Sequence, residues 1–172
     1  MTVPELKSFL DEKADFYNNL SFIDVDPISV PHRFSLKQDI EIIGFLTATI
    51  SWGNRKSIIK DAEKMLNFMG NSPFDFIKNS SVKELNSLEK TGIHRTFNGE
   101  DFKEFVTNLK RIYSQNESLE NLFLTQNGEE NFYHALHRFR ESFIGENLHR
   151  SRKHVSSTYK NSSAKRLMMF LR

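Results

Sequence analysis

The chain has 172 residues, 38% of them hydrophobic, which suits one domain with a substantial core and is too little for two full domains. It contains no cysteine, which excludes disulfide bonds, thiolate metal sites and a cysteine nucleophile. Its apolar runs are shorter than a membrane span, and its first residues lack the basic and apolar regions of a signal peptide. We therefore expect a cytoplasmic protein without a membrane partner.

The net charge of +2 conceals a strong asymmetry along the chain. Residues 131–172 carry nine Lys and Arg against two Glu, a net +7, whereas the first 130 residues carry −5. Four of the six histidines also lie in this basic third. A segregated positive end predicts a polyanionic partner, although a solvated basic face explains the charge about equally well.

Apolar residues spaced three and four apart predict helices along most of the chain. The predicted helices cover residues 6–20, 35–52 and 58–70, two short segments that start at 73 and 81, and then 102–113, 119–124, 132–143 and a last segment after 163. The first helix is expected to bury one apolar face, and a loop with two prolines follows it over residues 21–34. We find no convincing strand. The pattern predicts an all-α, multi-helix orthogonal bundle that forms a single domain over residues 1–172, with a basic loop at 146–163.

Three of these helices have serine residues at the position of an N-cap. Ser35 has Gln38 three places further on, and Ser81 has Glu84, which are both the spacing of a capping box. Ser162 and Ser163 precede the last helix, which is still apolar on one face at Arg172. Because helices seldom end on an uncapped apolar face, we expect this chain to be the N-terminal part of a longer one.

The segment between the second and third predicted helices combines residues that suit a nucleic acid. It reads Ser51-Trp52-Gly53-Asn54-Arg55-Lys56. Glycine allows the backbone to approach a ligand closely, the indole can stack on a base, and the two cations can meet phosphates. The alternative is that Trp52 belongs to the core and that the two cations are solvated.

A second candidate lies in the basic third, where a cluster of cations is followed by hydroxyl side chains. The cluster comprises Arg150, Arg152, Lys153 and His154. Cations and hydroxyls are the usual donors to a nucleic-acid backbone, so this segment is a predicted DNA contact. An exposed structural loop would have the same composition.

Lys165 begins the last predicted helix, with Arg166 beside it. Neighbouring cations and a helix N-terminus disfavour the ammonium form of a lysine, which makes the amine more nucleophilic, although a plain surface lysine is the simpler interpretation. His134 and His137 share a helical face without an acidic residue at a third ligand position, so no metal is expected. No cofactor motif is present, and the sequence does not define an oligomeric state.

Several motifs resemble an uncharacterised bacterial family, the domain of unknown function 2400 family. They are Asp26-Pro27, Pro31-His32-Arg33-Phe34, Ile42-Ile43-Gly44-Phe45, Ser51 to Lys56, His94-Arg95-Thr96-Phe97, Arg152 to Ser156 and Lys165 to Arg172. They span most of the chain in the expected order. Members of that family continue further by roughly a third of their length, which agrees with the expectation of a longer protein.

That family resembles, more distantly, the helix-hairpin-helix DNA glycosylases. The resemblance places Trp52-Gly53-Asn54 at the turn that probes DNA, and Lys165 at the position of a catalytic lysine, most like the divergent archaeal 8-oxoguanine glycosylases. It implies a base flipped from the duplex and attack of Lys165 on the sugar C1′, with strand cleavage through a Schiff base. The Gly-x-Gly hairpin expected before Lys165 is absent, which puts the usual phosphate grip in doubt.

The same resemblance implies an incomplete helix-hairpin-helix fold that lacks its C-terminal helices. The segment with the catalytic aspartate is not among these 172 residues, so this chain is expected to bind DNA weakly and not to turn over. The leading prediction is a DNA glycosylase or lyase-like protein. The alternatives are a non-catalytic nucleic-acid-binding helical domain and a protein-interaction scaffold.

Overall fold

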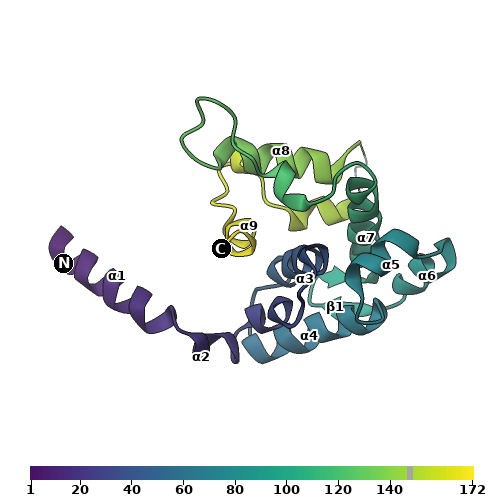
Figure 1. The fold of residues 1–172 in the computed structure, drawn as a ribbon, viewed down its shortest axis with the longest axis horizontal. Coiled ribbons are helices and arrows are strands. Elements are labelled where there is room, and N and C mark those ends of the chain that lie inside the picture. The colour runs from purple at the N-terminus through teal and green to yellow at the C-terminus, as the bar shows by residue number, and fades with distance from the viewer. Residues whose placement is uncertain (147–148) are drawn as a thin grey trace.

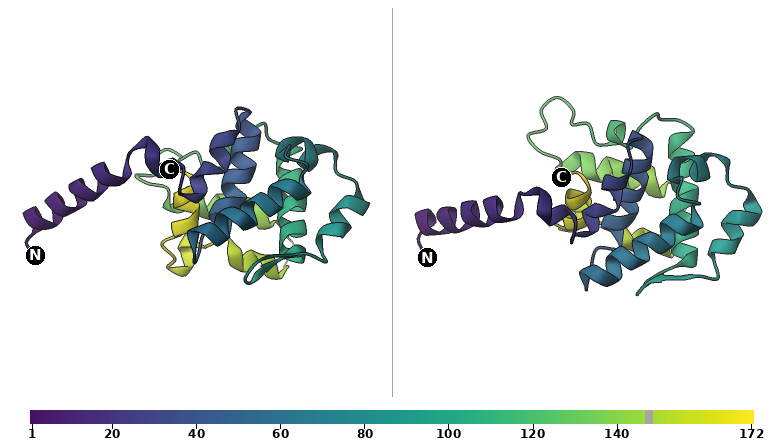
Figure 2. Two further views of the ribbon diagram at one scale, coloured as in Figure 1. Left: turned by 90° about the horizontal axis from the view of Figure 1, so that it is seen from below. Right: turned by 60° about the horizontal axis from the view of Figure 1, so that its bottom comes forward.

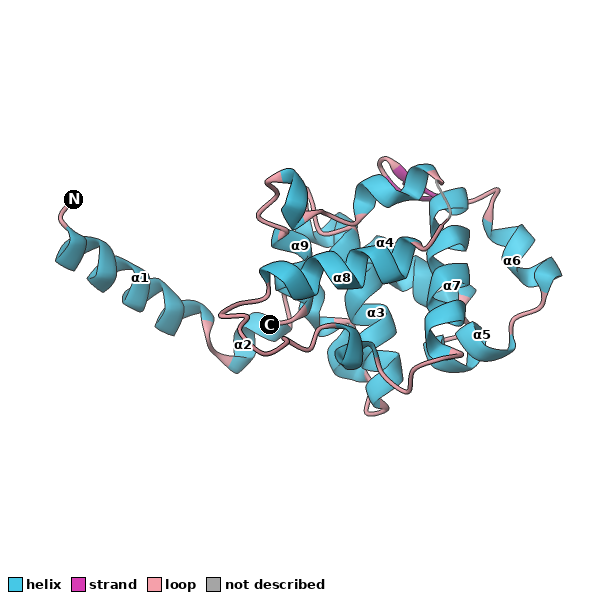
Figure 3. Ribbon diagram, turned by 90° about the horizontal axis from the view of Figure 1, so that it is seen from above, coloured by secondary structure: helices cyan, strands magenta, loops and turns pink. Residues whose placement is uncertain are grey.

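A computed structural model describes residues 1–146 and 149–172. Helices dominate it, and one short β-hairpin interrupts them (Figure 1; Figure 3). The α-helices are α1 (Val3–Tyr17), α2 (Leu20–Ile23), α3 (Lys37–Thr49), α4 (Arg55–Phe68), α5 (Pro73–Asn79), α6 (Val82–Leu88), α7 (Gly99–Tyr113), α8 (Tyr133–Ile144) and α9 (Lys165–Phe170). Short 3-10 helices are η1 (Pro27–Ser29), η2 (Pro31–Arg33), η3 (Leu119–Leu122), η4 (Arg150–His154) and η5 (Thr158–Lys160). The predicted all-α class is confirmed.

Helix α3 lies at the centre of the bundle, and α4, α5 and α9 pack against it. Almost all of its side chains from Glu41 onward are buried, as its sequence, apolar nearly all round, predicts. The ring of Phe45 contacts four other phenylalanines, from α7, α8 and α9: Phe105, Phe139, Phe143 and Phe170. The core therefore joins the N-terminal half of the chain to the basic third.

The expected burial of the first helix is wrong. Helix α1 forms where predicted, with Thr2 and Glu5 in a capping box and Pro4 in its first turn, but none of its residues is buried. It projects away from the rest of the molecule in every view (Figure 1; Figure 2). Its apolar side chains, such as Phe9 at 48% and Phe16 at 65% exposure, face solvent. Periodicity predicts a helix, but not that a partner covers its face.

Two of the three expected serine caps are also wrong. The cap residue of α3 is Leu36, whose apolar side chain cannot accept a hydrogen bond, and Gln38 instead donates to the carbonyl of Glu117 at 3.0 Å. The cap residue of α9 is Ala164, in the left-handed region at φ +48°, while Ser162 Oγ accepts from its N–H at 3.1 Å. The capping box of α6 at Ser81 is confirmed.

The segment expected to be a loop before α7 contains a hairpin that the sequence did not predict. Strands β1 (Gly92–His94) and β2 (Phe97–Asn98) pair antiparallel, with Arg95 in the turn at φ +48°. Ile93, His94 and Phe97 are buried, because the hairpin packs between α4 and α7. Three- and two-residue strands are too short for an alternating pattern to show.

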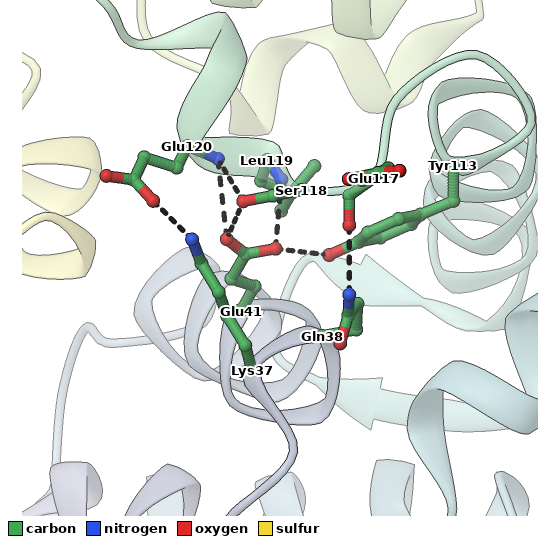
Figure 4. Close-up of polar contacts among 8 residues, drawn as sticks. All are labelled: Lys37, Gln38, Glu41, Tyr113, Glu117, Ser118, Leu119 and Glu120. Atoms are coloured by element: carbon green, nitrogen blue, oxygen red, sulfur yellow. Dashed lines mark hydrogen bonds and ion pairs between the residues drawn. The ribbon is translucent and has the colours of Figure 1, made fainter.

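Glu41 joins α3 to the segment that contains η3 (Figure 4). Its buried carboxylate accepts hydrogen bonds from the hydroxyls of Tyr113 (2.8 Å) and Ser118 (2.5 Å) and from the backbone N–H groups of Leu119 (2.9 Å) and Glu120 (3.4 Å). Burial, together with the Glu41 carboxylate, raises the pKa of Tyr113, so its hydroxyl stays a donor. These donors satisfy the carboxylate, which makes Glu41 a structural residue.

Part of the predicted basic loop at 146–163, namely residues 147 and 148, lies outside the described residues. The remainder contains η4 and η5. None of the described helices combines the length and the apolar character needed to cross a lipid bilayer.

Candidate nucleic-acid interface

Residues 51–54 link α3 to α4, and we call them the Trp52 turn. Ser51 Oγ donates to the carbonyl of Thr47 at 2.7 Å, which closes the end of α3. Gly53 has φ +105°, a conformation open to glycine and strained for other residues. The Asn54 side chain then accepts from two N–H groups of the first turn of α4, at 3.0 and 3.3 Å. Ser51, Gly53 and Asn54 thus each have a structural reason for their type.

Three distant segments meet the indole of Trp52. The guanidinium of Arg166, from α9, lies 4.9 Å from the ring centroid. The ring of His154, from η4, stacks nearly parallel at 6.0 Å, and that of His94, from β1, meets it edge-on at 5.0 Å. The half-buried indole therefore forms the meeting point of the Trp52 turn, the hairpin and the basic third.

Arg166 also anchors α9 to α3 by a direct hydrogen bond. Its Nη1 donates to the carbonyl of Thr49 at 2.8 Å, at the end of α3. Burial lowers the pKa of this guanidinium from its high ordinary value. The cation–π contact and this hydrogen bond fix the start of α9 beside the Trp52 turn.

His94 is hydrogen-bonded to the backbone of the Trp52 turn. Its Nδ1 lies 2.6 Å from Asp61 Oδ2, and its Nε2 lies 3.0 Å from the carbonyl oxygen of Trp52. A buried imidazole thus ties the hairpin to α4 and to the turn together.

The basic η4 segment is attached to α7 through the fully buried Asp101. Its carboxylate accepts from Arg150 Nε at 3.1 Å and Nη2 at 2.8 Å, and from the backbone N–H of Asn98 at 3.1 Å. Burial alone raises the pKa of Asp101, but the hydrogen bonds from Arg150 and Asn98 outweigh it and the pKa is lowered. Asp101 therefore remains ionised and fixes Arg150.

His154 lies between Asp101 and Trp52. Its Nε2 is 3.4 Å from Asp101 Oδ2, a contact too long and poorly directed for a hydrogen bond. Burial lowers the pKa of His154 more than the charge of Asp101 raises it. The ring is therefore neutral at pH 7 and packs against Trp52 as an aromatic group.

Other predicted cations are exposed at the surface. Lys165 is the first residue of α9, next to Arg166, and Lys56 is the second residue of α4, after Arg55. Arg152 and Lys153 are exposed on η4. Arg55 turns away from Trp52, since its Nε lies 3.7 Å from Asp26 Oδ2 and its guanidinium covers the ring of Phe22.

Two surface pockets lie away from the Trp52 turn. One of about 510 Å³ is lined by Gln38, Phe74, Tyr113 and residues 114–117. The other, of about 500 Å³, is more apolar and is lined by residues of α3, of η3 and the segment after it, and of α9, among them Phe123 and Phe170. Neither is lined by the Trp52 turn or by Lys165. Within the described ranges, no three His, Asp or Glu side chains gather as metal ligands.

Comparison with known proteins identifies the family of this chain. Residues 26–172 match the family described as "Protein of unknown function (DUF2400)". The chain belongs to this family. Searches of curated proteins and of solved structures find no match.

The DUF2400 match contains Trp52 and the three side chains that contact its ring, whereas α1 and α2 precede the match. Of the predicted site residues, the structure brings together Trp52, His154 and Arg166, and it attaches Arg150 through Asp101. Two other predicted site residues have structural partners: Arg55 pairs with Asp26, and Ser51 donates a hydrogen bond to the carbonyl of Thr47.

The sequence reasoning missed four residues next to the Trp52 turn or η4: Asp61, His94 and Asp101, described above, and Arg95, whose guanidinium lies at Gly53. Only His94 and Arg95 gave a signal, as part of the His94-to-Phe97 motif. Asp61 and Asp101 lie on amphipathic helices, where an acidic residue usually faces solvent.

Proposed function

We propose that this chain binds duplex DNA through the surface formed by the Trp52 turn, η4 and the start of α9. The observation that carries the proposal is the contact of Arg166 with the Trp52 ring. It brings the helix that starts with Lys165 beside a glycine turn that precedes α4. Arg166 contacts the partly exposed indole, and further cations are exposed on η4 and at the starts of α4 and α9, an arrangement that suits a phosphate backbone.

The finer proposal is that Lys165 is the nucleophile of a glycosylase or lyase-type reaction. The residue is exposed, and the described part of the chain offers it no hydrogen bond or ion pair, so its amine is accessible. A base flipped from the duplex would leave C1′ of its sugar open to this amine. Trp52 is contacted by three side chains in this structure, so its stacking on a base stays a prediction.

Salt-dependent binding tests the interaction with DNA. Fluorescence anisotropy of a labelled 20-base-pair duplex, measured between 50 and 200 mM KCl, should give a log–log slope of roughly −3 to −5 if about four phosphates are neutralised. A variant in which Arg152 and Lys153 are both alanine should lose up to about 2 units of this slope. A slope near zero in the wild type contradicts the proposal.

Schiff-base trapping tests the amine separately from binding. On a duplex with a preformed abasic site, the Lys165 amine adds to the C1′ aldehyde of the ring-opened sugar, water leaves, and borohydride reduces the imine to a stable secondary amine. Lys165→Ala should lose the trapped adduct. The matched control is Lys160→Ala, which removes an exposed lysine of η5 and should keep it.

Binding without any Lys165-dependent adduct would favour the non-catalytic nucleic-acid-binding domain. The third candidate, a protein-interaction scaffold, is favoured by one observation, the uncovered apolar face of α1. The absence of both binding and trapping would leave the scaffold as the better interpretation.

A further inference from the structure

Arg95 is a cation that the structure holds next to the Trp52 turn. It occupies the turn between β1 and β2 at φ +48°, and its side chain is exposed. The preceding residue, His94, is hydrogen-bonded to Asp61 and to the carbonyl of Trp52. Because His94 is fixed to the Trp52 turn, the next residue along the hairpin is fixed beside it.

The guanidinium of Arg95 lies where a side chain on Gly53 would be. A Cβ atom built on Gly53 would lie 2.5 Å from Arg95 Nη2, 2.7 Å from Cζ and 3.2 Å from Nε. The first two distances are shorter than real Cβ contacts allow, so any other residue at position 53 displaces the guanidinium. The glycine therefore does more than permit φ +105°: it leaves room for the arginine to lie across the backbone.

The charge of Arg95 is not neutralised in this position. Among residues 1–146 and 149–172, no carboxylate forms an ion pair with it. By contrast, Arg33 pairs with Glu63, Arg55 with Asp26 and Arg150 with Asp101. A planar guanidinium with free donors is suited to hold a phosphate oxygen pair in a bidentate manner.

We propose that Arg95, seated on Gly53, is a phosphodiester-binding residue, and that Gly53 leaves the space in which its guanidinium lies. The inference rests on the proposed DNA binding and deepens it, since it names one phosphate contact and the residue that positions it. The competing interpretation is that Arg95 only packs on the turn. Packing predicts an effect on folding, whereas phosphate binding predicts an effect on salt dependence.

The first experiment replaces the arginine. Arg95→Ala should weaken binding of the labelled duplex about fivefold to tenfold near 100 mM KCl and reduce the salt slope by about 1. Arg95→Lys should keep the slope and lose part of the affinity, because ammonium cannot bind in a bidentate manner. The control is Lys83→Ala on α6, at the opposite end of the bundle from α9 (Figure 1; Figure 3), which should change neither.

The second experiment tests the pairing with Gly53. Gly53→Ala should reduce the slope as Arg95→Ala does, and the double variant should be no weaker than the weaker single variant. Gly70→Ala is the matched control, since Gly70 also has positive φ, at +61°, but nothing lies within 4 Å of its added Cβ. Full additivity of Gly53→Ala and Arg95→Ala would overturn the pairing.

A small probe separates this inference from the proposed function. Trp52, the only tryptophan, adjoins Gly53 and reports on the turn by its fluorescence. Pyrophosphate at constant ionic strength should change the emission in the wild type and not in Arg95→Ala. Such a change without duplex binding would contradict the proposed function and support the phosphate contact. Duplex binding that Arg95→Ala leaves unaltered in slope would overturn the contact and leave the function standing.

Discussion

Asp101 is a single residue on which the position of the basic η4 segment depends. The fully buried carboxylate has lost its hydration and is compensated by Arg150 and by the backbone N–H of Asn98. Removing one member of such a buried group leaves its partners unsatisfied, which costs more than the pair contributes by itself. Its substitution therefore tests whether η4 is held as the structure indicates.

Asp101→Asn should lower the free energy of unfolding by about 2–4 kcal/mol at pH 7, measured by urea denaturation. Because the folded-state pKa of Asp101 lies below its ordinary value of 3.8, the ionised group stabilises the fold above that pH. This contribution is lost as the pH falls through the lower, folded-state pKa. The difference between wild type and variant should therefore shrink in acid, and an equal difference at pH 2.5 and pH 7 would contradict the assignment.

His154 gives a second prediction at the residue scale, because its ring stacks on the only tryptophan. Burial lowers its pKa below the ordinary 6.5, so its protonation shifts to more acidic pH and its neutral form stabilises the fold above pH 6.5. An imidazolium next to an indole quenches its fluorescence. Emission of Trp52 should therefore fall as the pH drops below 6.5.

His154→Gln should remove this step in the pH titration of Trp52 emission. His94 also contacts the indole, so His94→Gln serves as the comparison. The prediction would be wrong if the step survived in His154→Gln and disappeared in His94→Gln, because His94 would then be the quenching residue.

At the scale of elements, the attachment of the η3 segment to α3 depends on Glu41 (Figure 4). Glu41→Gln replaces one acceptor oxygen by an amide that donates, and this amide then faces donors from Ser118 or Leu119. We expect unfolding to require about 2–3 kcal/mol less free energy, measured in urea. Glu117→Gln, at an exposed neighbouring position, should change it by less than about 0.5 kcal/mol.

Most helices could be predicted because their signals are local. The spacing of Phe102, Phe105 and Leu109 by three and four residues determines the buried face of α7 without reference to any other element. The hairpin could not be predicted, since residues 92–98 form it only when α4 and α7 cover Ile93 and Phe97. Local sequence patterns therefore predict the helices, whereas the hairpin depends on packing between distant segments.

The candidate site was predicted in part for the same reason. Residue types singled out Trp52 and Arg166, but their contact joins positions far apart in sequence and depends on how α9 packs on α3. The role of Asp101 depends on a distant arginine in the same way. Arg95 had only its place in a motif as a signal, because its relation to Gly53 appears only in three dimensions.

For the whole molecule, the distribution of burial and the family match agree on where the packed body begins. The match starts at residue 26, where Asp26 caps η1, and α1 before it contributes nothing to the core. An uncovered 15-residue helix is marginal in water, so α1 should fray while α3 and α7 remain protected. Removing α1 should therefore hardly change the stability of the remaining molecule.

A variant that starts at residue 19 tests this division of the molecule. Residues 1–18 carry four acidic and two basic side chains, so their removal raises the net charge from +2 to +4. We expect the free energy of unfolding to change by less than about 0.5 kcal/mol, because no described α1 side chain is buried. Affinity for duplex DNA should stay equal or rise, since the repulsion between acidic residues and phosphates decreases. Thermal unfolding and anisotropy measure the two quantities, and a large loss of stability would show that α1 packs against the body in solution.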